Sequence, residues 1–122
     1  TRTHYTNIWG NDEDKKIRHE AIQESTKKAI LIPLETLQIA YDAVELSAKI
    51  AKIGNTNALS DAGVAAINAN AAAKAAYLNV RINMASIEDE NWKNEIMKKA
   101  ELLLQKVDEI ALVAENFVKG KI

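Results

Sequence analysis

Four polar side chains recur in the middle of the chain at a spacing that would gather them on one side of a helix. They are Asp61, Asn68, Asn79 and Asn83. At about 100° per residue, these positions fall within roughly 60° of arc. A carboxylate there could act as a general base or stabilise a cationic intermediate, and carboxamides could orient a substrate or a water molecule. We therefore expect the stripe to open onto one water-filled cavity.

The same residues also have a purely structural explanation. An acidic residue near a helix N-terminus complements the helix dipole, and buried asparagines commonly pair between helices. Ser60 is a good N-cap, so we expect this helix to begin there, with Asp61 in its first turn, and to run to about Met84. Asn55 follows Gly54 in a segment typical of a turn and would lie at the same end of the helix.

Two helices are expected before this segment. The first should begin near Asp12 and include Ala29 and Ile30 on its apolar side, because acidic residues at its start and lysines near its end suit the helix dipole. Pro33 disfavours helical geometry at Ile32 and fits the first turn of a helix. We therefore expect a separate second helix from Pro33 to Ile53.

The last helix should begin at a capping box from Ser86 to Asp89 and continue to about Lys119. Apolar residues step along it by three or four positions: Trp92, Ile96, Ala100, Leu103, Val107, Ile110, Ala114 and Phe117. At about 1.5 Å per residue this helix would be on the order of 45 Å long, so part of it could serve a partner subunit. The segment from Thr1 to Asn11 reads as a loop. The sequence thus predicts one all-α domain over residues 1–122, an antiparallel bundle of long helices.

Composition excludes several classes of protein. Hydrophobic residues make up 48% of the 122 residues, which argues against disorder, and the formal charge of −1 argues against a nucleic-acid partner. The chain has no cysteine, which excludes disulfides and thiolate sites and is compatible with a cytoplasmic location. No apolar run is long enough to span a membrane. His4 and His19 do not have the spacing of a metal site, so we expect no metal.

Three motifs together carry a resemblance to a known family. They are Gly54-Asn55-Thr56-Asn57, Ser60-Asp61-Ala62-Gly63-Val64 and Asn79-Val80-Arg81-Ile82-Asn83. With Pro33 upstream and Asp89 downstream, the chain resembles the cyclodeaminase/cyclohydrolase domain family of folate metabolism. That family includes the cyclodeaminase half of formiminotransferase-cyclodeaminase and stand-alone methenyltetrahydrofolate cyclohydrolases.

The resemblance implies an all-helical homodimer that binds a reduced folate in a cleft. The cyclodeaminase closes 5-formiminotetrahydrofolate to 5,10-methenyltetrahydrofolate with release of ammonia, and the cyclohydrolase adds water to the methenyl bridge. Neither reaction requires a metal or a redox cofactor. By this resemblance Asp61 would stabilise the cationic carbon. The residues implied to position the substrate are Asn55, Ser60, Asn79 and Asn83.

The chain departs from the family pattern at its start, and the sequence also allows a function other than catalysis. Family members begin with a helical region that contains a segment of the type Pro-Gly-Gly-Gly-Ser, and this chain has none. The resemblance therefore implies that the chain corresponds to the C-terminal portion of the family domain. The alternative is a non-catalytic interaction or scaffold domain that dimerises through its long C-terminal helix.

Overall fold

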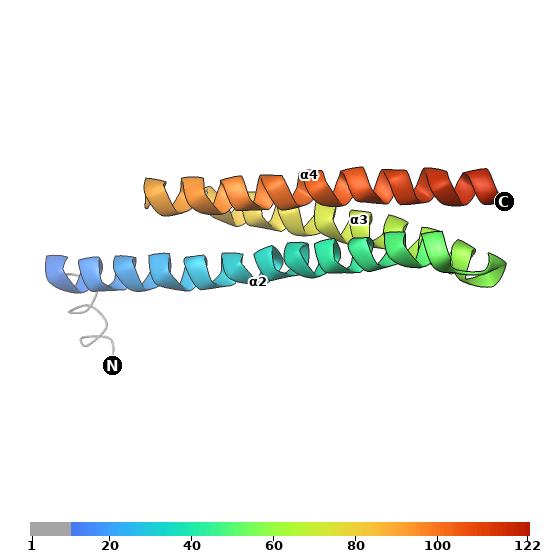
Figure 1. Ribbon diagram of the computed structural model, residues 1–122. Helices are drawn as coiled ribbons and strands as arrows, with labels where there is room; N and C mark the ends of the chain where they lie inside the picture. Colours follow the sequence, from blue (N-terminus) through green and yellow to red (C-terminus); the bar gives the residue numbers. More distant parts are fainter. Residues whose placement is uncertain (1–10) are drawn as a thin grey trace, which may run out of the picture.

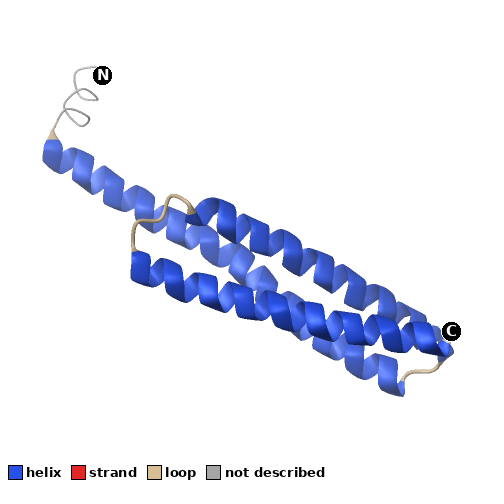
Figure 2. Cartoon of the chain, turned by 90° about the horizontal axis from the view of Figure 1, so that it is seen from above, coloured by secondary structure: helices blue, strands red, loops and turns tan. Residues whose placement is uncertain are grey.

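The computed structural model describes residues 11–122, which form three long helices packed antiparallel side by side (Figure 1). The helices are α2 (Asp12–Ile53), α3 (Thr56–Met84) and α4 (Glu90–Lys121). Short turns join them at opposite ends of the bundle (Figure 2). Residues 11–122 contain no strand, so the prediction of an all-α bundle is confirmed. The loop predicted at the start of the chain lies, apart from Asn11, outside the described residues.

The predicted break before Pro33 is wrong, because α2 is one continuous helix through this residue. A proline inside a helix costs about 3 kcal/mol. Ile30, Leu34 and Leu37 surround it and are all buried against the other two helices. Burying each such side chain contributes about 1.5–3 kcal/mol, which offsets the local penalty.

The start of α3 also differs from the prediction. Its N-cap is Asn55, whose side-chain oxygen accepts a hydrogen bond from the Ala58 N–H at 3.1 Å. Ser60, the predicted cap, and Asp61 therefore lie in the second turn, and the first turn contains no acidic residue. Because the dipole effect fades within the first turn, the location of Asp61 owes little to it.

The start of α4 is set by Asp89 rather than by the predicted Ser86. An oxygen of the Asp89 carboxylate accepts a hydrogen bond from the Trp92 N–H at 3.1 Å. The Ser86 hydroxyl instead donates to the Asn83 carbonyl oxygen at 3.2 Å. The pattern located the boundary of the helix but assigned its cap to the wrong end of the motif, because both residue types cap helices well.

Small side chains let α3 approach both of its neighbours closely. The alanines that it buries are Ala62, Ala66, Ala69, Ala73 and Ala76. At its N-terminal end Gly63 lies against α4, and a Cβ added there would lie 3.0 Å from a methyl carbon of Val118. That separation is shorter than ordinary van der Waals contact, so a larger residue at this position would have to displace the Val118 side chain by a few tenths of an ångström.

Candidate functional site

Asp61 presents an unengaged carboxylate on the surface of α3. The residue is exposed, and among residues 11–122 its side chain has no hydrogen-bond or ion-pair partner. Some other carboxylates near the helix ends are tied to neighbours, as Asp89 is to Lys27 at 3.0 Å. A carboxylate without such partners is available to a substrate.

Asn79 and Asn83 line a groove of about 480 Å³ between α2 and α3. The Asn83 side-chain amide donates to the Asn79 backbone carbonyl oxygen at 2.9 Å, which fixes its orientation along the groove. The Asn79 carboxamide has no such partner in the described part of the chain. The groove residues are Ala29, Ile32, Pro33, Thr36, Ala72, Ala75, Ala76, Asn79 and Asn83. Mostly apolar walls with a few polar groups are typical of small-molecule sites.

Pro33 adds a polar group to this groove that the sequence analysis missed. Because proline has no N–H, the helical hydrogen bond from residue 33 to the Ala29 carbonyl oxygen cannot form. Ala29 and Pro33 both line the groove, so a main-chain acceptor without its helical donor lies at its wall. The signal was present as a proline in an apolar helical pattern, but we interpreted it as a helix boundary.

Asn55 and Ser60 lie at the opposite end of α3, in two other grooves. Asn55 lines one of about 430 Å³ with Lys52, Lys121 and Phe117. Its side-chain oxygen is used for the cap, which leaves the amide group for other contacts. Ser60 lines a groove of about 300 Å³ where α3 meets the end of α4. The two lysines could pair with a carboxylate of a ligand.

The predicted site residues thus form two groups. Asn55, Ser60 and Asp61 lie at one end of α3, and Asn79 and Asn83 lie at the other. Eighteen residues separate Asp61 from Asn79, which corresponds to about 27 Å along the helix. No bicyclic ring spans that distance, so one chain does not bring these groups to one cavity. The roles of these residues remain predictions.

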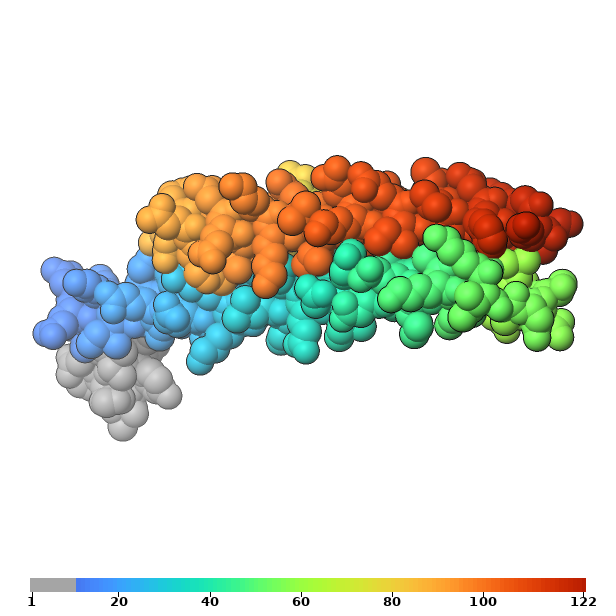
Figure 3. Space-filling model, viewed as in Figure 1, coloured from blue at the N-terminus to red at the C-terminus, as the bar shows by residue number. Residues whose placement is uncertain are grey.

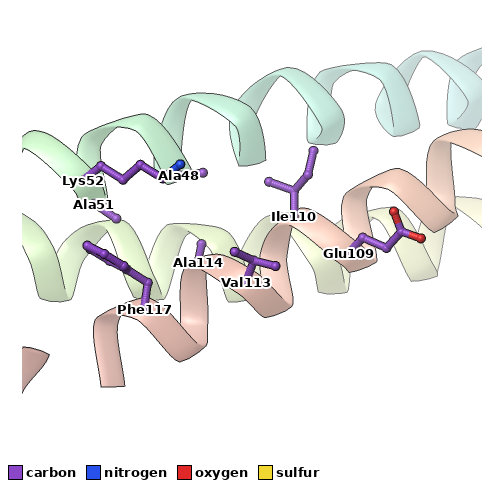
Figure 4. Close-up of a pocket in the computed structure, with 8 residues that line it drawn as sticks. All are labelled: Ala48, Ala51, Lys52, Glu109, Ile110, Val113, Ala114 and Phe117. Atoms are coloured by element: carbon purple, nitrogen blue, oxygen red, sulfur yellow. The ribbon is translucent and has the colours of Figure 1, made fainter. Parts of the chain in front are cut away.

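A further groove lies between α2 and α4 and has a volume of about 290 Å³ (Figure 4). Its walls are mainly apolar, and it contains none of the residues predicted for the site. Ala51 and Ala114 are small and face the ring of Phe117, which leaves the hollow between the helices. Lys52 and Glu109 supply its only charged side chains. Opposed small residues on two helices would have been the sequence signal for this groove, but their pairing depends on how the helices pack.

The described residues hold no cluster of histidine and acidic side chains that could bind a metal ion. His19 instead lies 2.7 Å from a carboxylate oxygen of Glu88, and His4 is outside the described residues. None of the three helices combines the length and hydrophobicity needed to cross a membrane.

Fold and surface together define a helical domain with exposed carboxylate and carboxamide groups beside grooves of ligand size. Comparison with known proteins identifies its family. The sequence model of the formiminotransferase-cyclodeaminase family matches residues 4–102. The chain is 34% identical over 111 residues to methenyltetrahydrofolate cyclohydrolase from Methylorubrum extorquens, which covers 91% of this chain and 53% of that protein.

Other relatives are longer proteins. Formimidoyltransferase-cyclodeaminase from Sus scrofa is 33% identical over 108 residues, covering 85% of this chain and 19% of that protein. The protein of the same name from Dictyostelium discoideum is 35% identical over 100 residues, covering 76% and 19%. This chain therefore belongs to the formiminotransferase-cyclodeaminase family of folate one-carbon enzymes. It spans about half the length of the cyclohydrolase and a smaller share of the longer relatives.

Proposed function

We propose that this chain acts on the 5,10-methenyl bridge of a reduced folate, as a methenyltetrahydrofolate cyclohydrolase. The observation that carries the proposal is the unengaged carboxylate of Asp61, within a chain that matches a cyclohydrolase over 91% of its length. The methenyl carbon lies between two nitrogens and carries positive charge. An anionic group held beside it stabilises that charge and the transition state for attack by water.

In this proposal each site residue has a distinct role. Asp61 stabilises the cationic carbon and accepts the proton that the attacking water loses. Water adds to the methenyl carbon and leaves a hydroxyl group on it. The bond from that carbon to N5 then breaks, N5 retains the electron pair and takes up a proton, and the hydroxyl loses its proton to become the carbonyl of a formyl group on N10. Asn55 and Ser60, which lie at the same end of α3 as Asp61, position the substrate beside it. Asn79 and Asn83 hydrogen-bond the pterin edge from a second copy of the chain, because about 27 Å of helix separates them from Asp61 within one chain.

A cyclodeaminase is the second candidate, because the matching family model and several relatives carry that name. Its reaction closes 5-formiminotetrahydrofolate to the same methenyl compound and releases ammonia. The same carboxylate would stabilise the same cationic carbon. A homodimer and a cytoplasmic location belong to this proposal as well, as does the assignment of the chain to the C-terminal portion of the family domain.

The test mixes the protein with 5,10-methenyltetrahydrofolate and measures both turnover and binding of this compound. Turnover appears as loss of the near-ultraviolet absorbance of the methenyl compound, and binding is measured by calorimetry. Ammonia release from 5-formiminotetrahydrofolate tests the cyclodeaminase in parallel. For Asp61→Ala we expect turnover to fall about 10²–10³-fold, the effect of removing one charge-stabilising group.

Asp42→Ala is the matched control, since Asp42 is an exposed carboxylate on α2 that lines none of the grooves above. It should leave turnover unchanged. Turnover that survives Asp61→Ala would remove Asp61 from the mechanism. Neither binding nor turnover by the wild-type protein would contradict the enzyme and favour the scaffold domain.

A further inference from the structure

The groove between α2 and α3 that holds Asn79 and Asn83 carries polar groups but no charge. None of the described residues that line it has an ionisable side chain. A charged part of a ligand would therefore lose its hydration there without gaining a partner of opposite charge. A groove of about 480 Å³ has the volume of a small-molecule site, so the part of a ligand that suits it is neutral.

The side chains of the groove mainly offer hydrogen-bond acceptors. The Thr36 hydroxyl donates to the Ile32 carbonyl oxygen at 3.3 Å, which uses its only proton and leaves its oxygen free to accept. Asn83 donates one amide proton to the Asn79 backbone carbonyl oxygen at 2.9 Å, and its side-chain oxygen remains an acceptor. The Asn79 carboxamide has no partner within residues 11–122, so it can both donate and accept.

A further acceptor at the wall of the groove is the Ala29 carbonyl oxygen, which Pro33 leaves without its helical donor. Water or a donor on a ligand satisfies such an oxygen. Because α2 continues unbroken through Pro33, a rigid helix holds this oxygen, and no side chain has to be ordered when a ligand binds to it. A fixed backbone acceptor of this kind favours the specific recognition of an N–H group.

A flat, neutral ring edge with adjacent N–H donors matches this set of acceptors. The pterin ring of a reduced folate has such an edge, because a primary amine at C2 lies next to the N–H at N3. The anionic glutamate tail of a folate does not suit a groove without a cationic side chain. The chemistry of the groove therefore selects the pterin ring of the proposed substrate rather than its tail.

We propose that the Ala29 carbonyl oxygen accepts a hydrogen bond from the 2-amino group of the pterin, and that Pro33 determines specificity because it frees this oxygen. Thr36 and Asn83 accept from the remaining donors of the same edge. This assignment rests on the proposed function and extends the recognition of the ring from the asparagines of α3 to the opposite wall of the groove, on α2. A ring without the 2-amino group leaves the oxygen unpaired, so the site discriminates against it.

Pro33→Ala separates binding from stability, because the two should change in opposite directions. Alanine restores the N–H of residue 33, which bonds the Ala29 carbonyl oxygen and removes this acceptor from the groove. The melting temperature should rise by about 5–10 °C, since proline is the least favourable residue inside a helix. The affinity for 5-formyltetrahydrofolate, a stable reduced folate, should fall about 3–10-fold in calorimetry. An unchanged or higher affinity would overturn the proposal.

Two further variants separate the lost acceptor from the gain in stability. Pro33→Gly restores the same N–H but favours the helix less, so the affinity should fall as it does for Pro33→Ala while the melting temperature rises less. Asn116→Ala raises helix propensity at an exposed position of α4 that lines none of the grooves above, and it should leave the affinity unchanged. An equal loss of affinity in Asn116→Ala would overturn the proposal, because the loss would then follow stability.

The 2-desamino analogue of 5-formyltetrahydrofolate tests the same hydrogen bond from the side of the ligand. The wild type should bind the analogue about 3–10-fold more weakly than the parent compound, whereas Pro33→Ala should bind both about equally. Equal discrimination by the two proteins would overturn the assignment of Ala29, even if the wild type turns over the methenyl compound and so keeps the proposed function. Discrimination that depends on Pro33, without any turnover, would support the assignment and contradict the proposed function.

Discussion

The two ends of the bundle use their polar side chains differently. Where α3 turns into α4, Gln23 of α2 donates to the Ser86 carbonyl oxygen at 2.8 Å and accepts from the Glu88 N–H at 3.0 Å. Lys27 reaches Asp89 in the same turn at 3.0 Å. The first turns of α2 extend beyond this turn, as the space-filling view shows (Figure 3).

At the opposite end, the turn from α2 to α3 is held by local contacts. The Gly54 N–H donates to the Ile50 carbonyl oxygen at 2.7 Å, and Asn55 caps the next helix. The buried cluster there is small and separate from the main core, with Leu59 and Val118 as its largest members. Asp61 belongs to this end and has no partner in the described chain. The turn between α3 and α4 is therefore held by polar contacts with α2, whereas the turn between α2 and α3 is held locally, and Asp61 beside it has no partner in the described chain.

The largest expected effect on stability comes from an apolar side chain at the end of the bundle where α3 turns into α4. Ile87 lies in the α3–α4 turn and is 3% exposed, packed in the main core with Met84. Ile87→Ala should lower the free energy of unfolding by about 2–5 kcal/mol, through lost burial and the cavity left behind. Urea denaturation measures this change.

Ile53→Ala is the matched control at the other end, where the isoleucine is 85% exposed. Its effect should stay within about 0.5 kcal/mol. Equal losses of unfolding free energy for Ile87→Ala and Ile53→Ala would contradict the contrast between the two ends of the bundle.

An intermediate effect on stability is expected from replacing the glutamine of α2 that hydrogen-bonds the turn between α3 and α4. Gln23→Ala removes two hydrogen bonds to the backbone of the α3–α4 turn. Each is worth about 0.5–1.5 kcal/mol net, and both are solvent-exposed, so the loss should be about 1–2 kcal/mol. Hydrogen exchange should quicken in this turn first. Gln105→Ala, which removes only a contact to Glu109 within α4, should leave exchange in the turn unchanged.

The smallest effect is the pH dependence of the Lys27–Asp89 pair. The Trp92 N–H, and then Lys27, lower the pKa of Asp89 below 3.8. The hydrogen bond to Asp89 raises the pKa of Lys27 above 10.5. The stabilisation from Asp89 is thus present above pH 3.8 and lost as the pH falls through its lowered pKa. That from Lys27 is present below pH 10.5 and lost as the pH rises through its raised pKa.

Asp89→Asn isolates this pair, because asparagine also caps helices well. The melting temperature of the variant should lie below that of the wild type at neutral pH, and the difference should shrink in acid. A difference that stays constant from neutral to strongly acidic pH would show that the ion pair contributes nothing.

Much of the fold could be predicted from local patterns. The apolar steps from Trp92 to Phe117 predicted α4, and Gly54 marked the end of α2. The helix starts were less accurate, since several residues near each start can serve as the cap. Asn55 and Asp89 were selected over Ser60 and Ser86 by where the chain turns, which depends on the packing of the helices.

The candidate site was only partly predictable. Periodicity predicted that Asp61, Asn79 and Asn83 share one side of a helix and open onto one cavity; all three are exposed, but one chain does not bring them to a single cavity. It could not show that Asn79 and Asn83 line a groove that Asp61 does not reach, because an angular stripe contains no information about distance along the axis. Nor could it reveal the free Ala29 carbonyl oxygen, which required knowing that the helix continues through Pro33.

By itself, the sequence determined that the chain is helical and to which family it belongs, because helical period, capping residues and motif identity are local properties. Only the tertiary structure decided that α2 runs unbroken past Pro33, since burial of Ile30, Leu34 and Leu37 on distant segments outweighs a local penalty. It also decided how far apart the polar groups lie, because a rigid helix fixes their separation at its rise per residue.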